Sequence, residues 1–172
     1  MKISRAERGD LPRILAIQKE AFLAEAAFYN DYTITPLRQS LEEMEADFKS
    51  MVFLKAESDG IIVGSVRLSR SGETCLVGRL VVDPRFQKRG IGGALLLSAE
   101  SECPDATRLE LFTGLKSEAN IRLYERHGYV RFKEEVRQSG VSFVHMEKLR
   151  IQALALRIMH AANSDLPQPD KA

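Results

Sequence analysis

Short runs of alternating apolar and polar residues recur along most of the chain, and a turn signal bounds each run. Such runs predict β-strands over seven segments: 2–5, 52–57, 61–68, 73–82, 107–113, 129–138 and 141–148. Ser58-Asp59-Gly60 and Ser71-Gly72 are tight-turn sequences. The second, third and fourth strands are therefore expected to form an antiparallel meander.

Apolar residues at helical spacing occupy the stretches between these strands. They predict helices that begin at Leu11, at Thr35, at Ile91 and at Ser117. Asp10 is the expected cap of the first helix, whose apolar face runs to Phe22, and the pattern breaks over 28–35. The second helix continues to Phe48, and Gly128 stops the last one.

From Arg150 helical spacing returns, with an apolar edge formed by Ile151, Leu154, Ile158 and Met159. A helix over 150–163 leaves this edge exposed unless it packs on the domain or on a second copy, which makes a homodimer one hypothesis. Residues 164–172 have little apolar content, so we expect a disordered tail.

A crossover helix separates the strands at 73–82 and 107–113, and strands joined by such a crossover pair in parallel. The sequence therefore predicts one domain, 1–149, of the α/β (α+β) class. Its mixed central sheet has about seven strands, an antiparallel meander followed by a parallel pair, flanked by four helices plus the extra C-terminal helix.

Composition supports a folded domain and argues against nucleic acid or a membrane as a partner. A chain of 172 residues with 44% hydrophobic content is long enough to bury its own core. Its 25 basic and 24 acidic residues leave a net charge of +1, too small a field to recruit polyanions. The N-terminal segment lacks the apolar core of a signal peptide, and no apolar run is long enough for a bilayer, so we expect a cytoplasmic protein.

Cysteine and histidine do not form a recognisable metal or disulfide pattern. Cys75 and Cys103 are too few for a disulfide framework, and we expect free, buried thiols. His127, His145 and His160 are scattered along the chain. We therefore expect no metal site.

The stretch 78–100 joins an apolar strand to an apolar helix through a basic, glycine-rich loop. The apolar run 80–82 ends at Asp83-Pro84, and the helix opens with Gly90-Ile91-Gly92-Gly93. Glycine permits a tight turn and a close approach of the backbone, and the first N–H groups of a helix have no internal partners. A phosphate group is the expected ligand, with a purely structural turn as the alternative.

Three basic residues, Arg85, Lys88 and Arg89, surround this turn, and each either contacts phosphate or belongs to a solvated loop. A nucleoside triphosphate loop requires Lys-Ser/Thr directly after the last glycine, where this chain has Ala94. The glycine spacing also fails to fit a dinucleotide-binding fold. Both of those phosphate-binding classes are therefore disfavoured.

Two motifs resemble a known family. Residues 87–92, Gln-Lys-Arg-Gly-Ile-Gly, resemble the Q/R-x-x-G-x-G/A signature of the GNAT acetyltransferase superfamily. Residues 120–129, Asn-Ile-Arg-Leu-Tyr-Glu-Arg-His-Gly-Tyr, resemble its A-x-x-L-Y-x-x-x-G-F segment, and the order of predicted elements matches over 1–149. The resemblance implies the GNAT fold, with acetyl-CoA as the acyl donor.

The resemblance also implies which residues hold acetyl-CoA. The backbone of Leu80, Val81 and Val82 would pair with the pantetheine arm as an added strand does. The turn that would hold the pyrophosphate consists of Gln87, Lys88, Arg89, Gly90, Ile91, Gly92, Gly93 and Ala94. Ser117 stands where the family often has asparagine, and Asn120 where alanine is common. In the family this asparagine contacts the cofactor. We expect Ser117 or Asn120 to replace that contact, with a Ser117 that only caps its helix as the alternative.

The chemistry of amine acetylation requires a base and an acid. At pH 7 only about one in 2,500 alkyl amine molecules is neutral, so deprotonation of the ammonium costs about 4.6 kcal/mol of free energy. Glu110 stands where some family members carry a glutamate that acts as the general base. The other candidate bases are Glu73 and a bound water, and Glu110 could instead be a carboxylate that only faces solvent. Tyr124 matches the family's tyrosine that faces the cofactor sulfur, and it either protonates the leaving thiolate or only packs.

The resemblance places the acceptor beside the first two helices and their connection, which brings together Glu25, Tyr29, Asp31 and Tyr32. Carboxylates and aromatic faces suit a cation, although Asn30-Asp31 is also an ordinary turn. The function hypothesis is acetyl transfer from acetyl-CoA to a primary amine, either a small cationic amine or a peptide amino group, by direct attack on the thioester. The alternative is a CoA-binding module in regulation or assembly.

Overall fold

The computed structural model describes residues 1–136, 141–150 and 155. Its strands are β1 Lys2–Arg5, β2 Val52–Ser58, β3 Ile61–Ser71, β4 Thr74–Val82, β5 Arg108–Gly114, β6 Val130–Val136 and β7 Ser142–Leu149. Its helices are α1 Leu11–Tyr29, α2 Thr35–Arg38, α3 Leu41–Phe48, α4 Ile91–Ser101 and α5 Glu118–Arg126. The helix expected over 150–163 and the tail expected over 164–172 lie outside the described residues, apart from Arg150 and Ala155.

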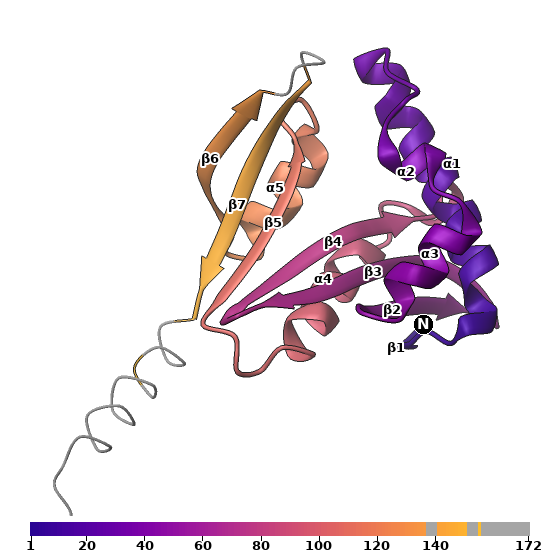
Figure 1. Ribbon diagram of the computed structural model, residues 1–172, viewed down its shortest axis with the longest axis horizontal. Helices are drawn as coiled ribbons and strands as arrows, with labels where there is room; N and C mark the ends of the chain where they lie inside the picture. Colours follow the sequence, from indigo (N-terminus) through magenta and orange to yellow (C-terminus); the bar gives the residue numbers. More distant parts are fainter. Residues whose placement is uncertain (137–140, 151–154, 156–172) are drawn as a thin grey trace, which may run out of the picture.

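The strands form one seven-stranded sheet in the order β1-β2-β3-β4-β5-β7-β6. β1 to β4 are antiparallel neighbours, β4 and β5 are parallel, and β5, β7 and β6 are again antiparallel. The predicted mixed sheet, with a meander and a parallel pair, is confirmed. In Figure 1 the two halves of the sheet diverge from the edge where β4 and β5 meet.

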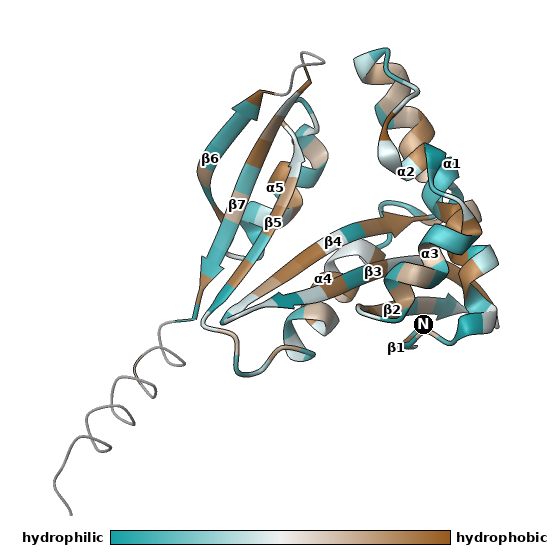
Figure 2. Cartoon of the chain, in the orientation of Figure 1, coloured by the Kyte–Doolittle hydropathy of each residue, from teal (hydrophilic) through white to brown (hydrophobic). Residues whose placement is uncertain are grey.

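Helices cover the two faces of this sheet. α4 and α5 pack on one face, where Leu95, Leu96 and Ile121 join a core with residues of β2 to β5 and β7. α1 and α3 pack on the other face, where Ile14 and Met44 contact a second core cluster. Hydrophobic residues concentrate along β4 and most of β3, whereas β6 is mostly hydrophilic (Figure 2).

The predicted helices differ from the observed ones in their division and in one cap. α1 ends at Tyr29, within the stretch 28–35 where the pattern breaks, and Asn30 follows it in the left-handed conformation with a φ of 51°. The second helix is divided into α2 and α3, because Ser40 and Glu43 form a capping box that starts a new helix. The Asp10 side chain accepts the Glu7 N–H instead of capping α1.

A buried polar network fixes α1 on the sheet. Arg67 of β3 is 4% exposed and donates to Gln18 of α1, to Gln39 and to Asp47 of α3. Its guanidinium lies 4.6 Å from the centre of the Phe53 ring. Burial, and after it the charge of Arg79, lowers the pKa of Arg67 to about 10. The network therefore joins the middle of α1 to β3 and α3.

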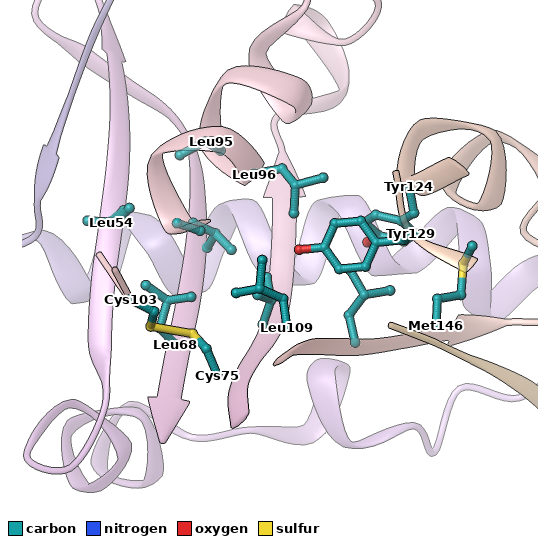
Figure 3. Close-up of a cluster of buried hydrophobic side chains, with 14 of the residues drawn as sticks. Leu54, Leu68, Cys75, Leu95, Leu96, Cys103, Leu109, Tyr124, Tyr129 and Met146 are labelled. Atoms are coloured by element: carbon teal, nitrogen blue, oxygen red, sulfur yellow. A yellow bond between two sulfur atoms is a disulfide. The ribbon is translucent and has the colours of Figure 1, made fainter. Parts of the chain in front are cut away.

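The expectation of free thiols is wrong, because Cys75 and Cys103 form a disulfide. Cys75 lies near the start of β4, and Cys103 follows the end of α4. α4 crosses back over the sheet, so its C-terminal end meets the beginning of the strand that preceded it. Figure 3 shows the pair at one end of the core, with Tyr124 and Tyr129 at the other end between Leu96 and Met146.

Candidate active site

β4 and β5 pair over three residues and then separate. The parallel ladder joins Thr74, Cys75 and Leu76 to Arg108, Leu109 and Glu110. Beyond it, no ladder bond between the two strands is found in the part of the chain that the structure describes. The edge of β4 over 77–82 therefore presents backbone groups that need a partner, and an extended ligand chain can supply one.

A β-bulge explains why β4 turns away. The register between β3 and β4 shifts between Ser65 and Arg67, and Arg79 has a φ of 50°. A bulge inserts an extra residue, bends the strand and increases its twist. β4 consequently leaves β5 after the third ladder pair and reaches the glycine-rich loop.

The loop ends at an uncapped helix N-terminus. Gly90, the N-cap of α4, has a φ of 80°, a conformation that favours glycine, and no side chain caps the helix. The first helical bond of α4 runs from the Ala94 N–H to the Gly90 carbonyl. The N–H groups of Ile91, Gly92 and Gly93 thus have no partner within the helix and are available to an anion.

The glycines that follow meet different neighbours. A Cβ on Gly93 would lie 3.1 Å from the His127 ring of α5, so this glycine allows α4 to pack on α5. A Cβ on Gly92 would lie 3.4 Å from Leu123 and 3.9 Å from Val82. Gly92 therefore faces the space between the end of β4 and α5, next to the separated strands.

The basic side chains of the loop differ in their partners. Arg85 is bound to Asp83, which is fully buried and also accepts a 2.6 Å bond from Arg13. Hydrogen bonds from Arg85 hold the pKa of Asp83 far below its usual range. Arg89 lies over the Phe86 ring, and in the described part of the chain no hydrogen bond or ion pair engages the Lys88 side chain. Lys88 and Arg89, rather than Arg85, remain candidates for phosphate contact.

Tyr124 of α5 lies beneath the separated strands. It is 7% exposed and packs against Tyr129, with ring centres 6.1 Å apart. Burial, and after it the negative charge of Glu25, raises the pKa of Tyr124 well above its usual value. The hydroxyl is therefore protonated at physiological pH and can donate a hydrogen bond.

Glu110 belongs to a charge cluster at the closed end of the β4–β5 pair, where the two strands are still hydrogen-bonded to each other. Its carboxylate lies 3.2 Å from Arg108 and 3.8 Å from His145, on the sheet face opposite α4 and α5. Arg108 also contacts Glu147 of β7 at 2.6 Å. The structure thus gives Glu110 an ion-pair partner, and its role as base stays a prediction. Glu73, the other candidate base, accepts a bond from Thr107.

Two of the predicted acceptor residues meet the loop after β5. Ser117 donates to the Glu25 carboxylate at 3.2 Å, and the Lys116 N–H donates to the Tyr29 hydroxyl at 2.9 Å. Gly114 allows this contact, because a Cβ there would collide with the Tyr29 hydroxyl and lie 2.9 Å from the Glu25 carboxylate. The Ser117 side chain consequently binds the Glu25 carboxylate and does not cap α5.

The remaining predicted residues lie nearby with other contacts. Asp31 accepts two bonds from Thr33 that build the turn after α1 and lower the pKa of the Asp31 carboxyl. Tyr32 is 57% exposed. Asn120 donates to Thr113 at 3.4 Å. The structure therefore brings Glu25 and Tyr29 to β5, whereas Asp31 and Tyr32 lie in the α1–α2 connection.

A hollow of about 580 Å³ lies elsewhere, between the ends of β2 and β3 and the segment after α4. Its lining includes Arg70, Glu102 and Cys103 and no residue of the glycine-rich turn. We place the candidate site at the separated strands instead, because unpaired backbone edges and free helix N–H groups are there. No helix in the described residues is long and apolar enough to span a membrane.

Known proteins resemble this chain in sequence and in fold. A family model described as an acetyltransferase (GNAT) domain matches residues 17–150. The UPF0157 protein YqkA of Bacillus subtilis is 26% identical over 116 residues, a match that covers 67% of this chain and 33% of that protein. The chain therefore spans about one third of the length of this curated relative.

Two crystal structures share the fold. The ribosomal-protein-S18-alanine N-acetyltransferase of Escherichia coli is 19% identical with a TM-score of 0.71, covering 86% of this chain and 92% of that one. The PaiA N-acetyltransferase of Thermoplasma acidophilum, in complex with coenzyme A, is 20% identical with a TM-score of 0.71, covering 87% and 100%. At these identities the likeness is one of fold.

Proposed function

The chain belongs to the GNAT acetyltransferase family, and we propose that it transfers an acetyl group from acetyl-CoA to a primary amine. The acceptor is a small cationic amine or a peptide amino group, and its nitrogen attacks the thioester directly. Residues 1–149 are the transferase domain in this proposal.

The separation of β4 from β5 beside the uncapped start of α4 supports acetyl-CoA as the donor. The pantetheine arm has amide groups that can pair with the backbone of 80–82, where β4 lacks a neighbour. The pyrophosphate then meets the turn 87–94, whose free N–H groups each contribute about 1.5–3 kcal/mol to a charged acceptor. The Thermoplasma relative, which holds coenzyme A on the same fold, supports this ligand.

Direct attack is favoured over a covalent enzyme intermediate. The two cysteines are joined in a disulfide, so neither offers a thiolate nucleophile. Tyr124 is the proposed donor to the departing sulfur, because a phenol is protonated at neutral pH and can give its proton to a thiolate. Glu110 is the base that the family resemblance suggests.

The groups at the end of α1 support a cationic acceptor. Glu25 is a half-buried carboxylate at the end of β5, and the Tyr29 ring lies beside it in the same helix. Asp31 and Tyr32 add a charge and an aromatic face at the α1–α2 connection. A cation over a tyrosine face contributes about 0.5–2 kcal/mol. The E. coli relative, which is named for a protein alanine, illustrates a peptide amino group as acceptor.

Assembly is a separate proposal. The apolar edge that the sequence places in 150–163 packs on the domain or on a second copy. Light scattering of a chain ending at Arg150 tests this, and an unchanged mass with unchanged solubility means that the segment is dispensable.

Release of free CoA thiol tests the proposed function. Acetyl-CoA is incubated with polyamines, amino acids, aminoglycosides and short peptides, first with the wild-type protein and then with Asp31→Asn and Tyr29→Ala. We expect sustained release with a cationic acceptor and a lower kcat/KM in both variants. Binding of acetyl-CoA without turnover on any amine would instead favour a CoA-binding module.

A further inference from the structure

We propose that Glu25 of α1 is the residue that removes the proton from the acceptor ammonium, with Ser117 holding its carboxylate in place. This inference rests on the proposed acetyl transfer. The sequence suggests Glu25 only as a residue beside the acceptor, and this inference makes it the general base. The same geometry places Glu110 too far along β5 for that role.

Glu25 fills the place of a missing side chain on β5. Side chains alternate along a strand, so Glu110, Phe112 and Gly114 share the face opposite the core residues Leu109 and Leu111. Gly114 stands at the open end of that row, where β4 and β5 have separated. The Glu25 carboxylate occupies the space above it, 2.9 Å from where a Cβ would be.

Distance along the strand separates the two candidate bases. Glu110 pairs with Leu76 in the last rung of the parallel ladder, at the closed end. Four residues of a strand span roughly 13 Å, which puts Gly114 and its Glu25 contact that far from Glu110. The β4 backbone at 80–82 also lies at the open end. A base must reach the attacking nitrogen directly or through one water, and the Glu25 carboxylate lies at that end of β5, whereas the Asp83 carboxylate after β4 is held by Arg13 and Arg85.

The electrostatic surroundings of Glu25 suit a base. Burial raises the pKa of the Glu25 carboxyl above its ordinary value, and the hydrogen bond from Ser117 and the charge of Arg79 partly offset this. The other ionisable groups around it are Tyr124 of α5 and Tyr29 of α1, with the Lys116 ammonium 5.8 Å from the Tyr29 ring. A raised carboxyl pKa narrows the gap to the ammonium pKa and makes the transfer less unfavourable.

Glu25 and Tyr124 are also coupled to each other. Burial is the larger cause of the raised pKa of Tyr124, and the charge of ionised Glu25 adds to it. Once Glu25 has accepted a proton this charge is gone, so the phenol becomes a stronger acid before the thiolate departs. Proton uptake by the base therefore prepares the acid, which a distant carboxylate such as Glu110 would not do.

Two protons leave the acceptor nitrogen during the proposed transfer. The ammonium gives one proton to the Glu25 carboxylate, and the neutral nitrogen forms a bond to the thioester carbonyl carbon. The carbon–sulfur bond breaks, and the sulfur takes the Tyr124 proton. The nitrogen loses its second proton, which restores the phenol. Glu25 then releases its proton to water, so the products are the amide, the free thiol and one proton.

The pH dependence of kcat/KM for thiol release tests the assignment. The wild-type profile should fall at acidic pH as Glu25 becomes protonated. Glu25→Gln should lower kcat/KM at neutral pH by about 100-fold or more and approach the wild type at high pH, where the amine is already neutral. Glu20→Gln, an exposed change on the same helix, is the matched control and should keep the wild-type profile.

Ser117→Ala separates proton transfer from a merely structural role. It removes a hydrogen bond that favours ionised Glu25, so the acidic limb should move to higher pH. Glu25→Asp retains a carboxylate and should retain an acidic limb with a lower kcat. A ¹³C NMR titration of the glutamate carboxyls, without acetyl-CoA, should show one group with a raised pKa that is absent in Glu25→Gln.

Each outcome decides the inference. If wild type releases thiol and Glu25→Gln keeps its pH profile, Glu25 is not the base although the acetyl transfer stands. If Glu110→Gln removes the acidic limb and Glu25→Gln does not, Glu110 is the base, as the family resemblance suggests, and this inference is overturned. If wild type releases no thiol with any amine, the proposed function fails together with it, whereas the NMR titration still reports the state of Glu25.

Discussion

Replacing Gly92 with valine should abolish acetyl-CoA binding and leave the protein folded. A Cβ at this position lies within 3.4 Å of Leu123 and 3.9 Å of Val82, which is ordinary packing distance. The two Cγ methyls of valine extend beyond it into the space between β4 and α5. That space adjoins the N–H groups proposed to hold pyrophosphate, so the side chain displaces the ligand rather than the fold.

The size of the effect follows from the groups that are lost. If valine keeps the pyrophosphate from two main-chain N–H groups, at about 1.5–3 kcal/mol each, binding weakens by about 3–6 kcal/mol. This corresponds to roughly a 140-fold to 20,000-fold increase in Kd. The free energy of unfolding should change by less than about 1 kcal/mol, since glycine is itself a poor helix residue.

Calorimetric titration with acetyl-CoA measures the affinity, and urea denaturation measures the stability. Gly9→Val is the matched control, because a Cβ on Gly9 meets no atom within 4 Å and Gly9 lies outside the site. Gly92→Ala should weaken binding by less than valine does. A folded Gly92→Val protein with wild-type affinity would show that the start of α4 does not hold the phosphates.

Three further predictions concern other parts of the molecule. Tyr124→Phe should lower kcat far more than the affinity for acetyl-CoA, because the lost hydrogen bond forms as the thiolate leaves; equal losses in both would refute this role. Asp83→Asn should destabilise the protein by about 2 kcal/mol at pH 7, a value reduced from that of a fully buried pair because Arg85 is exposed. The pKa of Asp83 is lowered by folding, so this stability is present above about pH 4 and is lost as the pH falls; a pH-independent difference in urea midpoint would contradict it. Reduction of the Cys75–Cys103 disulfide should lower the free energy of unfolding by about 3–4 kcal/mol, which equal urea midpoints with and without reductant would contradict.

Local rules explain most of what the sequence could predict. The strand, loop and helix over 78–100 follow from an apolar run, from Asp83-Pro84 and from glycines whose backbone conformation other residues rarely adopt. The meander follows from tight turns, and the parallel pair follows from the crossover helix. These features depend on neighbours in the sequence, so periodicity and turn chemistry suffice.

Contacts between distant segments were beyond such rules. The disulfide depends on where α4 ends over the sheet, which no spacing of Cys75 and Cys103 indicates. The sequence indicated only that Asp83 ends a strand. In the structure its buried carboxylate forms ion pairs with two arginines from different segments. The contact of Glu25 with Ser117 spans 92 positions in the sequence. Gly114, at the end of a strand, was the available signal for it, because an unexplained glycine there marks a close approach.

Mass spectrometry of the acceptor gives the most direct test of acetyl transfer. Wild-type protein, acetyl-CoA and the best cationic amine are incubated together, and the amine is analysed beside the released thiol. We predict an N-acetylated amine that accumulates in step with free CoA, one for one, and that is absent with Gly92→Val. Thiol release without an acetylated amine, or acetylation of an anionic acceptor alone, would contradict the function proposed for this chain.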